Sequence, residues 1–252
     1  MRINPDPDGA RRAAARARLK PPPRRRRLWR WLLGALVLWL TLSVVPVALM
    51  THWGPPGSTF MALAWLRAQV FGPRDFVLRW QPVSLAQMSL AARAAVVAAE
   101  DQRFLRHRGF DFEAIDLALR QHRAGQGLRG ASTISQQVAK NVFLWPGHSW
   151  LRKGLEAWFT LLLEALWSKA RILEVYLNVA QFGAGVYGVQ AASEYYFGGT
   201  AATLTPDQAA LLAAVLPNPR RLHVAAPSRY VRQRQAWIRR QMASVGPPPR
   251  AR

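Results

Sequence analysis

The 252-residue sequence contains no cysteine. A disulfide framework, a thiolate metal site and a cysteine nucleophile are therefore excluded, and the redox compartment cannot be read from cysteine usage. Acidic residues are also scarce, with 13 Asp and Glu against 35 Lys and Arg and a formal net charge of +22. This excess favours anionic partners, namely nucleic acid, acidic lipid head groups or a phosphorylated substrate, and charge alone does not choose among them.

Apolar residues, in contrast, are plentiful. Half of the residues are hydrophobic and eleven are Trp, so the chain can bury a sizeable core. Beyond Pro82 the apolar residues recur at helical spacing, and strand-like alternation is scarce. We expect a mostly α-helical fold with one main domain. The predicted helices cover residues 84–101, a segment capped by Asp111, 132–141 capped by Ser132, 150–167, 169–178, a segment ending at Tyr196, 206–216 and 229–242.

Composition divides the chain into five segments. Residues 1–30 form a basic cytoplasmic arm, 31–51 a transmembrane helix, 52–81 a membrane-proximal segment, 82–245 the main domain and 246–252 a disordered tail. The arm has eleven Lys or Arg against Asp6 and Asp8, which leaves +13 of the +22 net charge on the rest of the chain. The positive excess is therefore not confined to the arm.

The uncharged segment 31–51 is long enough to cross a bilayer, because a helix of this length extends about 31 Å. Arginines at 24–27 and 30 precede it, and the positive-inside rule predicts a cytoplasmic amino terminus and an external main domain. The alternative is a cleavable signal peptide. The apolar run is longer than a typical h-region and no small-x-small cleavage site follows it, so we favour a retained anchor.

A second apolar stretch follows at residues 60–71, interrupted only by the charge of Arg67. It is typical either of a short helix on the membrane surface or of a helix packed against the main domain. The sequence leaves both interpretations open.

Polar side chains that could take part in catalysis or ligand binding fall into three clusters. The pair Glu100 and Asp101 ends a predicted helix, Gln136 and Lys140 stand one helical turn apart, and Glu156 follows Arg152 and Lys153 at ion-pair spacing. Taken singly, each cluster is typical of a solvated helix surface.

Together, and in this order, the clusters resemble the peptidoglycan glycosyltransferase family. The similar blocks are E-D with the following Phe, His, Gly and Asp over residues 100–111, G-x-S-T-x-x-Q-Q-x-x-K-N over 130–141, R-K-x-x-E over 152–156, RILEVYLN over 171–178, YFG over 196–198 and AAVLPNP over 213–219. The resemblance covers about residues 82–242. Because no S-x-x-K or K-T-G signature of a transpeptidase domain occurs, the chain is similar to the monofunctional biosynthetic members.

The resemblance implies a lysozyme-like helical domain that polymerises lipid II into linear glycan strands at the bacterial inner membrane, with the catalytic domain in the periplasm. It implies that Glu100 is the general base and that the cations Lys140, Arg152 and Lys153 bind the polyprenyl diphosphate. The other substrate-binding positions that it implies are Asp101, Ser132, Thr133, Gln136, Gln137 and Asn141.

Glu156 resembles the second essential glutamate of that family, and two roles stay open for it. It either orients the neighbouring cations or helps to hold a divalent ion such as Mg²⁺ on the diphosphate. We favour orientation, and the resemblance implies no other cofactor. The sequence departs from the family at His148, where relatives often have arginine, and at Gln181, where monofunctional members usually have glutamate.

The partners implied are lipid II, the growing glycan, membrane lipids and other cell-wall synthesis proteins. Two rival functions are a lytic transglycosylase, which has no need of the cation cluster, and a non-catalytic membrane scaffold that uses the basic arm. Nucleic-acid binding ranks last, because the basic residues are spread through packed helices rather than gathered in a reader module.

Overall fold

The computed structural model describes residues 24–73, 76–125, 132–147 and 149–249. The chain divides into two compact units, residues 1–45 and 46–252. In the first unit the described residues all lie in helix α2 (Arg24–Leu49). The arm up to residue 23 and the last three residues of the predicted tail lie outside the described residues, so what was predicted for them stays a prediction.

Helix α2 is apolar along most of its length, and Arg27–Leu49 is long and apolar enough to cross a membrane. Its large side chains, such as Trp31 and Leu33, are mostly exposed. The helix begins before the predicted span because the arginine run continues it, and it ends at Leu49. Exposed apolar side chains on a helix of this length suit a lipid environment.

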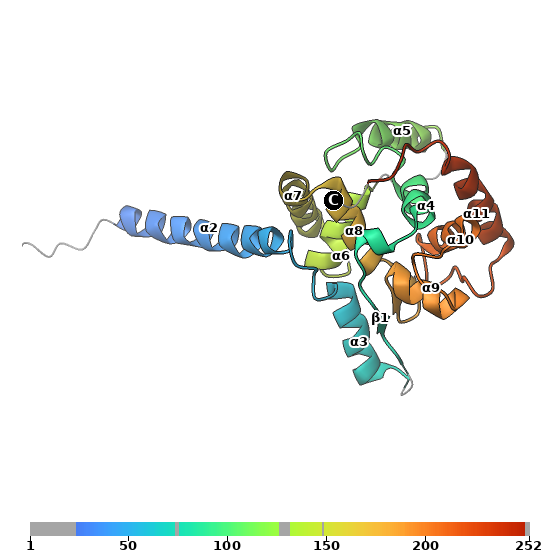
Figure 1. Cartoon of the computed structure of the whole chain (residues 1–252). Coiled ribbons are helices and arrows are strands. Elements are labelled where there is room, and N and C mark those ends of the chain that lie inside the picture. The colour runs from blue at the N-terminus through green and yellow to red at the C-terminus, as the bar shows by residue number, and fades with distance from the viewer. Residues whose placement is uncertain (1–23, 74–75, 126–131, 148, 250–252) are drawn as a thin grey trace, which may run out of the picture. The chain divides into compact units, whose positions relative to one another are not determined.

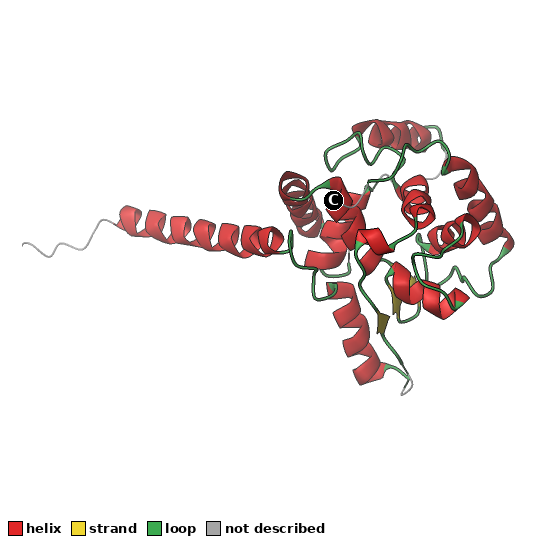
Figure 2. Cartoon of the chain, in the orientation of Figure 1, coloured by secondary structure: helices red, strands yellow, loops and turns green. Residues whose placement is uncertain are grey.

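The regular secondary structure of the second unit is mostly helical, with loops between the helices, as Figures 1 and 2 show. They are α3 (Thr59–Phe71), α4 (Leu90–Glu100), α5 (Phe112–Arg123), α6 (Ile134–Phe143), α7 (Trp150–Leu166), α8 (Lys169–Val179), α9 (Val189–Phe197), α10 (Pro206–Val215) and α11 (Arg229–Gln241). The predicted mostly helical fold is confirmed.

Helix α8 forms the centre of the core. It packs against α6, α4 and α9, and both faces of its last two turns are buried, including Leu173, Tyr176 and Leu177. Around it, α6 also packs against α7, and α10 packs against α4 and α11 (Figure 1). The helices that carry the three polar clusters are therefore anchored on a shared apolar core.

Helix starts follow the local capping chemistry. Asp111 caps α5 as predicted, accepting from the Ala114 amide. Two other starts differ from prediction. Ser84 holds only a short 3₁₀ turn over Leu85–Gln87, and α4 begins at Leu90 because the Ser89 side chain caps it.

The cap of α6 is Thr133 rather than the predicted Ser132. Thr133 forms a capping box with Gln136, in which each side chain bonds the other residue's backbone amide. A capping box needs Gln or Glu three residues after the cap, and only the threonine register provides it here.

Two strands between α8 and α9 and one strand before α4 form a small sheet that periodicity did not indicate. Strands β1 (Arg79–Trp80), β2 (Gln181–Gly183) and β3 (Val186–Tyr187) pair in the order β1-β3-β2. Strands this short show no alternation that sequence can reveal. Gly188, at a φ of +81°, lies where an added Cβ would be 2.9 Å from the Asn178 carbonyl oxygen, so glycine fits the close approach to α8.

Candidate active site

A polar cavity of about 530 Å³ opens between α3, α6 and α7. It brings together two predicted blocks, residues 132–140 and 152–156, that are separate in the sequence. Its lining consists of Phe60, Ser132, Gln136, Gln137, Lys140, Pro146, Gly147, Arg152, Lys153 and Glu156. Seven of these ten residues were predicted as site residues.

Cations gather at the α7 side of the cavity around one carboxylate. Glu156 is buried, and its two oxygens face Arg152 Nη1 at 3.3 Å and Lys153 Nζ at 2.5 Å. The helix places these side chains three and four residues apart, on one face. Arg152 is also buried, whereas the Lys153 side chain is half exposed. With Lys140 included, three cations and one carboxylate line the cavity, a net charge of +2.

Lys140 links the cation cluster to Glu100. Burial lowers the pKa of Lys140, the cations Arg152 and Lys153 lower it further, and the carboxylates Glu156 and Glu100 oppose them. Its ammonium group lies 5.9 Å from the centre of the Phe60 ring, within cation–π range. Lys140 is therefore a largely desolvated cation in the cavity lining, and an anionic ligand in the cavity would stabilise its charge.

Glu100 is the last residue of α4, and its side chain is 13% exposed. It joins the cavity through Gln137, which lines the cavity and donates from Nε2 to Glu100 Oε2 at 2.9 Å. Arg234 Nη2 lies 3.3 Å from the other oxygen, Oε1. Burial raises the pKa of Glu100, and Gln137, Arg234 and Lys140 oppose this rise. A buried carboxylate with a raised pKa is well suited to accept a proton.

Three other predicted residues hold the backbone of the site. The buried Asp101 carboxylate accepts from the Ile134 amide at 3.0 Å and faces His107 Nε2 at 2.9 Å, which ties the start of α6 to the end of α4. Thr133 donates to the Gly109 carbonyl at 2.6 Å. The Asn141 carbonyl accepts from Thr59 of α3 at 3.1 Å. Asp101, Thr133 and Asn141 do not line the cavity, and their predicted contacts with substrate stay predictions.

Several residues of the site were not predicted. Phe60, Pro146 and Gly147 line the cavity, Arg234 contacts Glu100, and Tyr176 donates from its hydroxyl to Gln137 Oε1 at 3.3 Å. Residues 60–71 read as an apolar stretch alone, and Arg234 was one of many arginines in a basic helix. Tyr176 belongs to the RILEVYLN block, but nothing in that block indicates a contact with Gln137.

The donor set around Glu156 does not fit a protein-held divalent ion. In the described part of the chain, no three Asp, Glu or His side chains converge on one point. Both Glu156 oxygens are already paired with cations, and those cations would repel a metal ion. The geometry suits the orienting role for Glu156.

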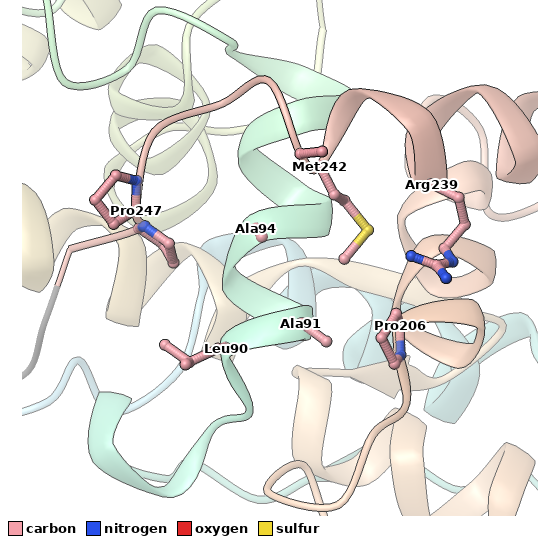
Figure 3. Close-up of a pocket in the computed structure, with 9 residues that line it drawn as sticks. Leu90, Ala91, Ala94, Pro206, Arg239, Met242 and Pro247 are labelled. Atoms are coloured by element: carbon pink, nitrogen blue, oxygen red, sulfur yellow. The ribbon is translucent and has the colours of Figure 1, made fainter.

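A second hollow, of about 440 Å³, lies at the other end of α4. Figure 3 shows Met242 and Arg239 on one side of it and Ala91 and Ala94 on the other. Its lining is mostly apolar, and Arg239 is paired with Asp207 at 2.8 Å. Among the residues that line this hollow, the single charged side chain is already paired, so the hollow does not suit the binding of a diphosphate.

Comparison with known proteins decides the family. The model of a family described as Transglycosylase matches residues 73–243. The chain belongs to the transglycosylase family. Curated relatives called biosynthetic peptidoglycan transglycosylase include one from Xanthomonas campestris pv. campestris, 51% identical over 229 residues that cover 91% of this chain and 93% of the relative. Others are from Pseudomonas aeruginosa, 52% identical over 88% of this chain and 95% of the relative, and Shewanella oneidensis, 48% identical over 88% and 94%.

The two departures from the transglycosylase pattern fall in different places. Gln181 lies in β2, where its Nε2 donates to the Gly183 carbonyl at 2.9 Å. It is absent from the lining of the cavity. His148 lies outside the described residues.

Proposed function

We propose that this transglycosylase polymerises lipid II into linear glycan strands with Glu100 as general base and the cation cluster Lys140, Arg152 and Lys153 as diphosphate site. The observation that carries the proposal is the hydrogen bond from Gln137, which lines a cavity with a net charge of +2, to the largely buried carboxylate of Glu100. The family and the names of the relatives support synthesis of peptidoglycan glycan.

The attacking group is the 4-hydroxyl of an acceptor sugar, which is a poor nucleophile until its proton is removed. Glu100, when ionised, accepts that proton as the bond to the anomeric carbon forms. Both of its oxygens are already held by donors, so little reorientation is needed at the moment of reaction. A single displacement inverts the anomeric centre, which turns an α-linked donor into a β-linked glycan.

The leaving group is a polyprenyl diphosphate whose negative charge is present before the bond breaks. It requires cations rather than a general acid, and the planar fork of Arg152 suits phosphate oxygens. Lys140 and Lys153 add point charges on the same cavity. We assign to Glu156 the role of orienting Arg152 and Lys153, because both of its oxygens face those cations.

For location, we propose a single-pass anchor in the bacterial inner membrane, with the amino terminus inside and the catalytic domain in the periplasm. The apolar helix and the arginines before it support this orientation. Membrane lipids and other cell-wall synthesis proteins are the further partners proposed, and nucleic acid is not. A periplasm-specific reporter fused after Met242 should be active, whereas cytoplasmic activity would contradict the orientation.

The function is tested by incubating the purified full-length protein, in detergent, with lipid II and separating the products. We expect linear glycan without cross-links, and penicillin should not block its formation. A lytic enzyme would instead release anhydro-sugar fragments from finished peptidoglycan and make no polymer from lipid II. A non-catalytic scaffold would leave lipid II unchanged. Either result would overturn the proposal.

A further inference from the structure

The Glu100 carboxylate is held from both oxygens by side chains of different helices. Gln137 of α6 donates to Oε2 at 2.9 Å, and Arg234 of α11 donates to Oε1 at 3.3 Å. The same Arg234 Nη2 also lies 3.3 Å from the Ala99 carbonyl oxygen, one residue before Glu100. Arg234 therefore hydrogen-bonds both the side chain of Glu100 and the backbone at the end of α4.

Tyr176 holds the Gln137 amide from the side opposite Glu100. The Tyr176 side chain is fully buried in α8, and its hydroxyl donates to Gln137 Oε1 at 3.3 Å. Because an ionised carboxylate only accepts hydrogen bonds, the amide nitrogen faces Glu100, and the amide oxygen on the other side accepts from the phenol. The reversed amide would set two acceptors, its own oxygen and the carboxylate, against each other.

We propose that Tyr176 and Arg234 are positioning residues of the transglycosylase reaction, which fix the Glu100 carboxylate from opposite sides, Tyr176 through Gln137 and Arg234 directly. The inference rests on the proposed function, in which Glu100 is the general base. Neither residue lines the cavity, so neither is expected to contact the diphosphate.

The groups around Glu100 set its pKa, so a change in its positioning can be measured in the pH dependence of the rate. Arg234 faces it from α11, Lys140 and Gln137 from α6, and Tyr176 from α8, while Asp101 follows it in the chain. Burial raises the pKa of Glu100, the Gln137 hydrogen bond and the charges of Arg234 and Lys140 lower it, and Asp101 raises it. Loss of Arg234, or loosening of the Gln137 hydrogen bond when Tyr176 is changed, therefore favours the protonated form of Glu100, which cannot act as a base. The acidic limb of the pH–rate profile then moves to higher pH.

The first test is Tyr176→Phe, which removes the hydroxyl and keeps the ring in the core. We expect kcat with lipid II to fall about three- to tenfold, as for loss of one hydrogen bond, with KM unchanged and the acidic limb shifted to higher pH. The matched control is Tyr187→Phe, which removes the hydroxyl of another buried tyrosine, on β3. The control should keep the parental kcat and limb, and thermal melting shows whether each variant is folded.

A double-mutant cycle separates positioning from packing. If Tyr176 acts through Gln137, Tyr176→Phe should add nothing to Gln137→Leu, because the residue that transmits its effect is gone. Multiplied losses in the double variant would overturn this part of the inference. Arg234→Gln should shift the acidic limb in the same direction, and Arg234→Lys, which keeps the charge, should restore part of the shift.

The inference and the proposed function fail in different ways. If Glu100→Gln polymerises lipid II at near the parental rate, the general-base role that the proposed function gives to Glu100 is wrong, and the inference built on that role falls with it. If Glu100→Gln is inactive while Tyr176→Phe and Arg234→Gln keep the parental kcat and acidic limb, only the positioning inference is wrong.

Discussion

Glu156 is a buried glutamate of the site and Glu100 a largely buried one, and their surroundings differ. The two oxygens of Glu156 face two cations on its own helix, Arg152 and Lys153. Glu100 instead accepts from one neutral amide and one arginine, each from another helix, and burial raises its pKa.

The difference shows how two identical side chains take different roles. A carboxylate whose two oxygens both face cations arranges those cations for an anionic ligand. A buried carboxylate with fewer charges around it gains a proton more readily, as a base must. The environment of each glutamate, rather than its residue type, assigns the role.

The largest effect is expected for Glu100→Gln. Glutamine keeps the size and much of the hydrogen bonding but accepts no proton from the sugar hydroxyl, so turnover of lipid II should fall by roughly 10²-fold or more. Initial rates of polymer formation measure this. Glu113→Gln, which alters an exposed glutamate of α5, is the control and should keep the parental rate.

Arg152→Ala and Lys140→Ala each remove one cation of the proposed diphosphate site. The diphosphate is charged in the ground state as well as in the transition state, so both kcat and the affinity for lipid II should weaken, turnover by roughly tenfold or more. Steady-state kinetics over a range of lipid II concentrations separate the two effects. Arg120→Ala, an exposed arginine of α5, controls for loss of charge alone. A loss of kcat with unchanged affinity would argue against the diphosphate site.

Glu156→Gln sharpens the contrast between the two glutamates. Arg152 and Lys153 keep their charges but lose their shared anchor, so we expect a smaller loss of about tenfold. The loss should be the same with added Mg²⁺ and with a chelator, because Glu156 orients cations. A loss that appears only when Mg²⁺ is present would instead assign Glu156 to a metal ion.

The pH profile should show the smallest effects. Glu100 must be ionised, and its pKa is raised by burial, so activity should fall on the acidic side at a pH above its usual 4.5. Lys140 must be protonated, and burial lowers its pKa, so the alkaline fall should begin below its usual 10.5. Lys140→Arg keeps the charge to higher pH and should move the alkaline limb upward. An alkaline limb that does not move would show that Lys140 does not set it.

Much of the fold was predictable because the signals are local. Asp111 caps α5 at the predicted residue, and Pro206 begins α10 at its first position. The first helix was predicted to begin at residue 84 and Ser132 was predicted as a cap, but Ser89 caps α4, which begins at Leu90, and Thr133 caps α6. Neighbouring hydroxyl residues compete for one helix start, and sequence spacing alone does not decide between them.

The site was predictable in part, for a similar reason. The spacing of Arg152, Lys153 and Glu156 places them on one helical face, and the structure pairs them. Contacts between distant helices leave no periodic signal. Arg234 meets Glu100 across 134 residues and Tyr176 meets Gln137 across 39, so neither partner was visible in the sequence.

The direct test of the division between the two glutamates is equilibrium binding of lipid II to catalytically impaired protein. Glu100→Gln should bind lipid II with the parental Kd although it does not polymerise it, while Arg152→Ala should bind more weakly. Weak binding by folded Glu100→Gln, with parental binding by Arg152→Ala, would contradict the account, because it would place the substrate contact at Glu100 and not at the cations.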